Sequence, residues 1–146
     1  MCIRDRYYTD SGCQKDLQLQ ESLYGKDGRQ VAMPLLGLSQ TLWVHGKAEE
    51  AEELARRALV ITENALGPDH MDTGYCRGYV AMTLQAQSKY TAAEPLYQQA
   101  LAAMEEPEHP EYATMLASYS ENCIALGKKQ VARHAFERAL KHADWS

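Results

Sequence analysis

The sequence predicts an all-α solenoid built from antiparallel helix pairs. Apolar residues recur at spacings of three and four, which is typical of amphipathic helices, and this pattern repeats along the chain. A shift of 42 residues places "GKAEEAEELARRAL" (46–59) on "SKYTAAEPLYQQAL" (88–101), and a further shift of 39 places it on "GKKQVARHAFERAL" (127–140). Three copies in register indicate a repeat architecture, because stacked units bury an apolar face that one unit alone would expose.

Each copy follows a second amphipathic run, so each unit is expected to contain two helices joined by a short turn at Gly46, Ser88 or Gly127. The apolar stripes of the three first helices comprise Leu35, Leu38 and Leu42, then Val80 and Leu84, then Leu116, Tyr119 and Cys123. Small residues that let paired helices approach closely coincide in all copies: Ala51, Ala93 and Ala132, then Ala58, Ala100 and Ala139.

The N-terminal stretch divides into two parts. "MCIRDR" matches the translation of a sequencing-library transposon end, so residues 1–6 are expected to be an adapter artefact. Residues 17–25 align with residues 59–67, which predicts that 7–27 is the second helix of a repeat whose first helix is missing. The chain is therefore expected to be a fragment of a longer protein, with full repeats at 28–68, 69–107 and 108–146, the last one serving as a C-terminal cap.

The stretch "GPDHMDTG" (67–74) could be a reactive site, a metal loop or a turn. The turn is favoured, because the equivalent of His70 is Gly28 in one copy and His109 in another. Gly67 is expected to end its helix as a left-handed cap, and Pro68 to prevent continuation. Asp69 or Asp72 would then cap the next helix.

Prolines fit the same layout. Pro34 and Pro95 are each expected in the first turn of a helix, where a missing N–H costs least. The third spacing is shorter by three residues, which indicates a shortened helix near Glu106 with Pro107 as its stop.

Composition excludes several classes of function. A net charge of -5 argues against nucleic acid or an anionic membrane as partner, and no apolar run approaches a membrane span. The four cysteines, Cys2, Cys13, Cys76 and Cys123, form no C-x-x-C pair, which favours reduced thiols and a cytoplasmic setting over disulfides or zinc.

Catalytic motifs are also missing from the sequence. It contains no glycine-rich phosphate loop, no G-x-S-x-G and no pair of histidines at i, i+4. We therefore expect no enzyme activity, no cofactor and no metal. The acidic run from Glu49 to Glu53 is interpreted as a solvated helix face with Glu52–Arg56 and Glu53–Arg57 pairs.

The repeated residues resemble the tetratricopeptide repeat, a helix pair of about 34 residues with small residues where the helices cross. The longer spacing and the stretch "ALGPDHMDT…LQAQSKYTAAEPLYQQAL" are similar to the kinesin-light-chain variety. That variety often carries paired asparagines in the first helix. The equivalent positions here read Leu36-Gly37, Gly78-Tyr79 and Ala117-Ser118.

The resemblance implies a protein–protein interaction module, in which first helices line a concave groove that binds a peptide or protein segment. Aromatic, methionine and amide side chains suit peptide recognition. The groove candidates are Met33, Gln40, Trp43, Tyr75, Tyr79, Met82, Gln85, Thr114, Ser118 and Glu121. An alternative role for Trp43 or Tyr79 is packing between neighbouring repeats. An alternative function keeps the fold but makes it the regulatory or sensor tail of a larger signalling protein or enzyme.

The two ends of the solenoid are expected to differ. The helix around Leu17 and Leu23 lacks its partner, so its apolar stripe should be exposed or frayed. The last unit should be better covered by its polar residues, which are Lys128, Lys129, Arg133, Glu137 and Lys141.

Overall fold

The computed structural model describes residues 10–105 and 109–143, and within these ranges it is helical with no strand. The elements are α2 (Asp10–Tyr24), the 3-10 helix η1 (Arg29–Val31), α3 (Ala32–Val44), α4 (Ala48–Leu66), α5 (Met71–Ala86), α6 (Tyr90–Glu105), α7 (Tyr112–Ala125) and α8 (Lys129–Ala143). The six helices predicted after residue 27 are confirmed, with breaks at the expected turns. Residues 1–9, which include the suspected adapter, lie outside the described residues, as do Glu106 and Pro107.

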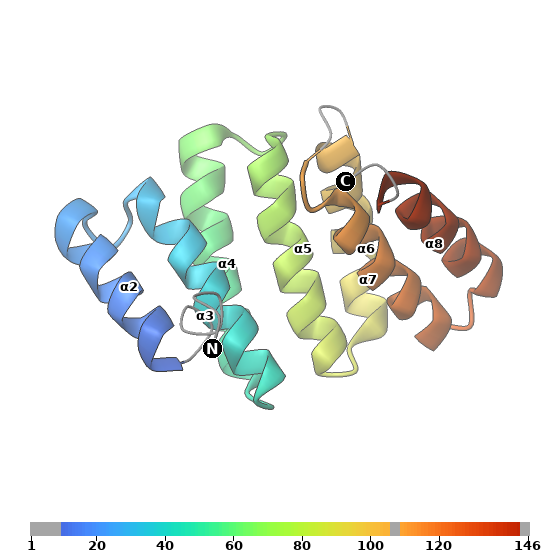
Figure 1. Ribbon diagram of the computed structural model, residues 1–146, viewed down its shortest axis with the longest axis horizontal. Coiled ribbons are helices and arrows are strands. Elements are labelled where there is room, and N and C mark those ends of the chain that lie inside the picture. The colour runs from blue at the N-terminus through green and yellow to red at the C-terminus, as the bar shows by residue number, and fades with distance from the viewer. Residues whose placement is uncertain (1–9, 106–108, 144–146) are drawn as a thin grey trace.

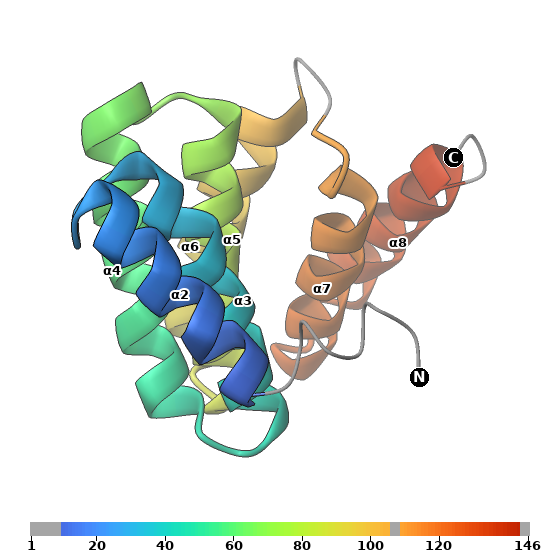
Figure 2. The ribbon, with the colours of Figure 1, turned by 60° about the vertical axis from the view of Figure 1, so that its left-hand side comes forward.

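The helices form consecutive antiparallel pairs, α3 with α4, α5 with α6 and α7 with α8, which stack side by side in an arc (Figure 1). Helix α5 contacts both α3 and α7, so the first helices form one continuous inner layer. Seen from another side, α7 and α8 lie on one side of the molecule, and α2, α3 and α4 lie on the other (Figure 2). Helices α6 and α7 approach each other closely along less of their length than α4 and α5 do.

The alanines that recur in all three repeats lie where paired helices cross. Ala51, Ala93 and Ala132 are all buried. In the first and third pairs a serine hydroxyl bridges the crossing: Ser39 Oγ donates to the carbonyl oxygen of Ala51 at 2.7 Å, and Ser120 Oγ to that of Ala132 at 3.0 Å. A larger side chain at these alanines would push the helices apart, so the predicted packing role is confirmed.

The turns within pairs share one backbone conformation. Gly46 and Gly127 have φ angles of +83° and +78°, which favour glycine, and Ser88 adopts +62° at the equivalent position. Ser88 is the only non-glycine residue with positive φ in the described part of the chain. The three predicted intra-pair turns are therefore confirmed.

The two prolines differ. Pro34 lies in the first turn of α3, as predicted. Pro95 is inside α6, in its second turn, so that prediction is wrong. Helix α6 starts at Tyr90 directly after the Ser88 turn, and the bond from the Ala93 N–H to the Lys89 carbonyl already belongs to its first turn. The described part of α6 has 16 residues against 19 in α4, and the predicted end near Glu106 lies outside the described residues.

Ion pairs on α4 correct one expectation. Arg56 Nε does pair with Glu52 Oε2 at 2.7 Å. Arg57 instead reaches α2, where its Nη2 lies 3.1 Å from Glu21 Oε1 and donates to the Lys26 carbonyl at 2.7 Å. The predicted Glu53–Arg57 pair is wrong because contacts from another helix compete with the local one.

Apolar side chains are exposed at both flanks of the described arc. On α2, Leu17 packs against the core, whereas Leu23 is 62% exposed, as expected for that helix. On α8, Phe136 is 50% exposed although its equivalent in α6, Tyr97, is fully buried. Tyr97 is covered by α7, with its ring centroid 5.7 Å from that of Tyr119. The polar residues expected to cover this unit, Lys128, Lys129, Arg133, Glu137 and Lys141, are exposed too, but they leave Phe136 half exposed.

Candidate peptide-binding groove

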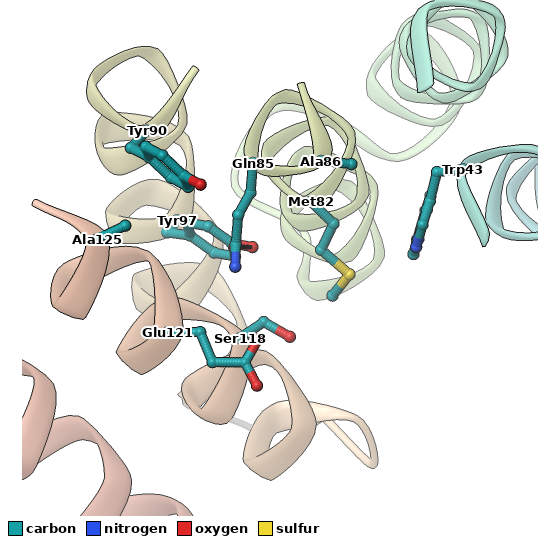
Figure 3. Close-up of a pocket in the computed structure, with 9 residues that line it drawn as sticks. All are labelled: Trp43, Met82, Gln85, Ala86, Tyr90, Tyr97, Ser118, Glu121 and Ala125. Carbon is teal, nitrogen blue, oxygen red and sulfur yellow. Dashed lines mark hydrogen bonds between the residues drawn. The ribbon is translucent and has the colours of Figure 1, made fainter. Parts of the chain in front are cut away.

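Two adjoining hollows lie on the inner face formed by α3, α5 and α7. The first, of about 350 Å³, is lined by Gln40, Trp43, Tyr75, Tyr79, Met82, Glu111, Thr114, Met115 and Ser118. The second, of about 360 Å³, is lined by Trp43, Met82, Gln85, Ala86, Tyr90, Tyr97, Ser118, Glu121 and Ala125 (Figure 3). Trp43, Met82 and Ser118 line both. We call the two hollows together the inner groove.

The groove contains nearly all of the residues that the sequence pointed to, with one exception. Met33 is 48% exposed but lines neither hollow. Sequence reasoning missed Tyr90 and Tyr97, which come from the second helix α6, because it took its groove candidates from first helices only. It also missed Met115, which fits against α5 because Gly78 has no side chain: a Cβ there would lie 2.1 Å from Met115 Cε.

Aromatic rings form one wall of the groove. The ring centroid of Tyr79 lies 5.4 Å from that of Trp43 and 5.0 Å from that of Tyr75, with the Tyr75 ring edge-on. The Tyr75 hydroxyl donates to the Tyr79 hydroxyl at 3.1 Å, and the Tyr79 hydroxyl to Gln40 Oε1 at 3.5 Å. Tyr79 is buried and joins α3 to α5, so it packs between neighbouring repeats. Trp43 remains partly exposed to the groove.

His70 and His109 lie near the N-terminal ends of α5 and α7, where each ring accepts a backbone hydrogen bond. His70 is the N-cap of α5, and its Nδ1 accepts from the Asp72 N–H at 3.0 Å, so the prediction that Asp69 or Asp72 caps this helix is wrong. His109 makes the same bond to the Glu111 N–H at 3.1 Å. Its ring stacks on Tyr75 with centroids 4.7 Å apart, and its Nε2 lies 3.4 Å from Asp72 Oδ1.

The Gly67 turn also departs from its predicted geometry. Its φ of +93° is positive, but its ψ of 163° is extended rather than left-handed helical. Pro68 explains the difference, because a residue before proline is pushed toward extended ψ. The Gly67 carbonyl then accepts a bond from Thr73 Oγ1 at 2.7 Å, which fixes the turn against α5.

Tyr97 supplies the floor of the second hollow. Its hydroxyl donates to Gln85 Oε1 at 2.5 Å, which leaves the amide group of Gln85 available to donate to a ligand. Burial raises the pKa of Tyr97, and the nearby carboxylate of Glu121 acts in the same direction. The hydroxyl therefore stays protonated and holds Gln85 in place.

Two kinds of reactive site can be checked in the described residues, which are metal clusters and cysteine thiols. No cluster of three His, Cys, Asp or Glu side chains that could hold a metal ion is found among them. Cys76 and Cys123 are buried, and burial raises the pKa of the Cys76 thiol to about 11, which disfavours the nucleophilic thiolate. In the described ranges no helix is both long and apolar enough to cross a membrane.

The stacked helix pairs and the inner groove define a helix-pair solenoid of the tetratricopeptide type. A family model described as "Tetratricopeptide repeat" matches residues 42–106 and again residues 78–144, well over half of the sequence. The chain belongs to the tetratricopeptide repeat family. Such repeats are generally protein–protein interaction modules and typically non-enzymatic scaffolds. No curated protein matches the sequence.

Solved structures share this fold. BtubC (BKLC) from P. vanneervenii aligns with a TM-score of 0.75 at 16% identity, over 90% of this chain and 54% of that one. Two crystal structures of a Podosopora anserina protein, described as a kinesin light chain with nearly identical TPR-like repeats, give TM-scores of 0.70 and 0.69 at 18% and 19% identity. Both alignments cover 97% of this chain and 72% of theirs. The chain thus shares the fold of these structures, and it spans about half the length of BtubC.

Proposed function

We propose that the inner groove binds an extended or helical segment of a partner protein through shape and side-chain complementarity. The observation that supports it is the pair of adjoining hollows, in which Trp43 and Met82 remain partly exposed between aromatic walls. A flat aromatic side chain at the centre of a groove can contribute a large share of binding energy, because it buries much area with little loss of conformational entropy.

Polar groups beside the rings would orient the ligand. Ser118 and Thr114 line the α7 side of the first hollow, and the Gln85 amide faces the second. Hydroxyl and amide groups can satisfy the N–H and C=O groups of a peptide backbone that leaves water. The groove therefore offers both an apolar anchor and partners for main-chain hydrogen bonds.

The test compares the two faces of the solenoid. A partner recovered by affinity purification is titrated by calorimetry against the wild type, Trp43→Ala and Arg56→Ala, after circular dichroism shows that each variant is folded. Arg56 lies on α4 and pairs only with Glu52 in the described residues. It is a control for the outer wall of the solenoid, which the second helices of the pairs form. We expect Trp43→Ala to weaken binding by about 2 kcal/mol, roughly thirtyfold, and Arg56→Ala to change it little. Equal losses would place the partner on the outer wall or an edge.

A further inference from the structure

The inner groove carries negative charge and no positive charge. Among its lining residues Glu111 and Glu121 are acidic, and none is lysine or arginine. Helix α3 contains no charged residue, and the only basic residue of α3, α5 and α7 is Arg77. Arg77 faces away from the groove, because its Nη1 donates to the Pro68 carbonyl at 2.7 Å and its Nη2 lies 3.9 Å from Glu63 on α4.

The carboxylate of Glu121 is accessible to a ligand. Glu121 is exposed and lines the second hollow beside Tyr97 and Ser118, and it also borders a hollow on the α8 side that Lys129 and Arg133 line. No hydrogen bond or ion pair to its carboxylate is found within the described residues. Figure 3 shows its side chain at one side of this hollow, with Met82 and Trp43 at the other. An apolar and aromatic surface therefore faces an unpaired carboxylate across one cavity.

This combination fits one kind of side chain. A long basic residue has an apolar stem, which can lie along Met82 and Trp43, and a cationic end, which can reach a carboxylate. Arginine fits better than lysine, because its planar guanidinium stacks on aromatic faces and binds a carboxylate through two N–H groups. An acidic ligand would instead be repelled by Glu111 and Glu121.

We propose that the segment bound in the inner groove is basic, and that it places an arginine in the second hollow with its stem against Met82 and Trp43 and its guanidinium at Glu121. This proposal rests on the proposed function of the groove and names the chemistry of its ligand. The charge selects the partner, and the aromatic wall supplies most of the affinity.

The experiment uses three pools of degenerate peptides that differ only in their fixed central residue, which is arginine, its neutral isostere citrulline, or glutamate. Each pool is passed over the immobilised full chain, and retention is quantified by mass spectrometry. We expect the arginine pool to be retained about three- to tenfold more than the citrulline pool, and the glutamate pool least. High salt should reduce the difference in retention between the arginine and citrulline pools, because it screens the charge on Glu121.

Two charge-neutralising variants test whether the preference for arginine over citrulline depends on Glu121. Glu121→Gln should remove the preference for arginine over citrulline. The matched control is Glu53→Gln, an exposed residue of α4 with no side-chain partner in the described residues, and it should leave the preference unchanged. Because both glutamates are exposed, neither substitution should affect folding. Trp43→Ala should lower retention of all three pools.

The outcomes separate the two proposals. Equal retention of all pools, lowered by Trp43→Ala, would overturn the basic ligand and leave the proposed groove intact. A preference for the glutamate pool, or an arginine preference that survives Glu121→Gln, would also overturn it. Retention of no pool, or retention that Trp43→Ala does not change, would count against the groove itself.

Discussion

Ser88 holds a backbone conformation that suits glycine better. Its φ of +62° is shared by Gly46 and Gly127 in the equivalent turns, and its side chain is exposed, so replacing it loses no packing. We expect Ser88→Gly to stabilise the fold by about 0.5–1 kcal/mol, since the relief of left-handed strain exceeds the entropic cost of glycine. Urea denaturation measures the difference. The reciprocal control, Gly127→Ser, should destabilise by a similar amount, and a loss of stability in Ser88→Gly would contradict the assignment.

Gly74 permits the close packing of α5 on α6. A Cβ at this position would lie 2.7 Å from the Ala103 Cβ and 3.0 Å from the Ala100 carbonyl oxygen. We expect Gly74→Ala to destabilise by about 1–3 kcal/mol, although alanine favours helix more than glycine does. Thermal unfolding measures this loss.

A double-mutant cycle shows whether the clash is the cause. Removing the opposing methyl group in Gly74→Ala/Ala103→Gly should recover part of the stability relative to the sum of the two single changes. Additive losses would mean that the two positions do not touch where α5 crosses α6.

Local sequence explains some of these residues but not others. The spacing of Gly46, Ser88 and Gly127 was enough to predict three equivalent turns, because a turn of fixed backbone conformation depends on a few adjacent residues. The cap of α5 was not predictable in this way. His70 caps α5 through its ring Nδ1, which accepts from the Asp72 N–H, and histidine is not among the residues that cap preferences point to.

Helix α2 has less support than the helices at the middle of the arc. It packs against α3 and η1, while Leu19 and Leu23 are exposed and Leu17 alone of its leucines contacts the core. We expect backbone amides in residues 14–24 to exchange with deuterium faster than those in residues 73–105, because local opening of α2 exposes little apolar surface. Mass spectrometry of the native protein measures both segments, and equal protection would refute the expectation.

The spacing of apolar residues along a helix predicts which face is buried, but it does not predict which other helices its side chains contact. Leu35, Val80 and Leu116 are buried, as their spacing indicated. Arg57 reached α2, 36 residues away in sequence, instead of Glu53 on its own helix. Tyr97 likewise reached the inner groove from a second helix. Both depend on how repeats stack, which the pattern within one repeat does not contain.

At the scale of the whole molecule, the repeat register predicted the solenoid and the position of its groove. Nearly all groove candidates line the two hollows because first helices follow one another along the inner face. The register treats every repeat as equal, however, so it did not distinguish Phe136 from Tyr97. The difference depends on whether another helix covers that face, as α7 covers Tyr97 in α6.

The contact between α6 and α7 has a consequence for cooperativity. Stability in a repeat array is approximately the sum of the stabilities of the units and of the interfaces between neighbours, so the smallest interface is where the array divides. Helices α6 and α7 share a smaller close contact than α4 and α5. We expect calorimetry to give a van't Hoff enthalpy below the calorimetric enthalpy, as α7–α8 melts before the rest. A single two-state transition would contradict this.

The same junction lies under the inner groove, since both hollows are lined by residues of α7 and of the preceding repeats. A ligand in the groove would hold α7 to α5 and add an interface at a junction whose own close contact is smaller than that of α4 and α5. Binding should therefore bring the two enthalpies together and raise the melting temperature most for α7–α8. On this view the occupied groove turns two weakly coupled blocks into one cooperative unit.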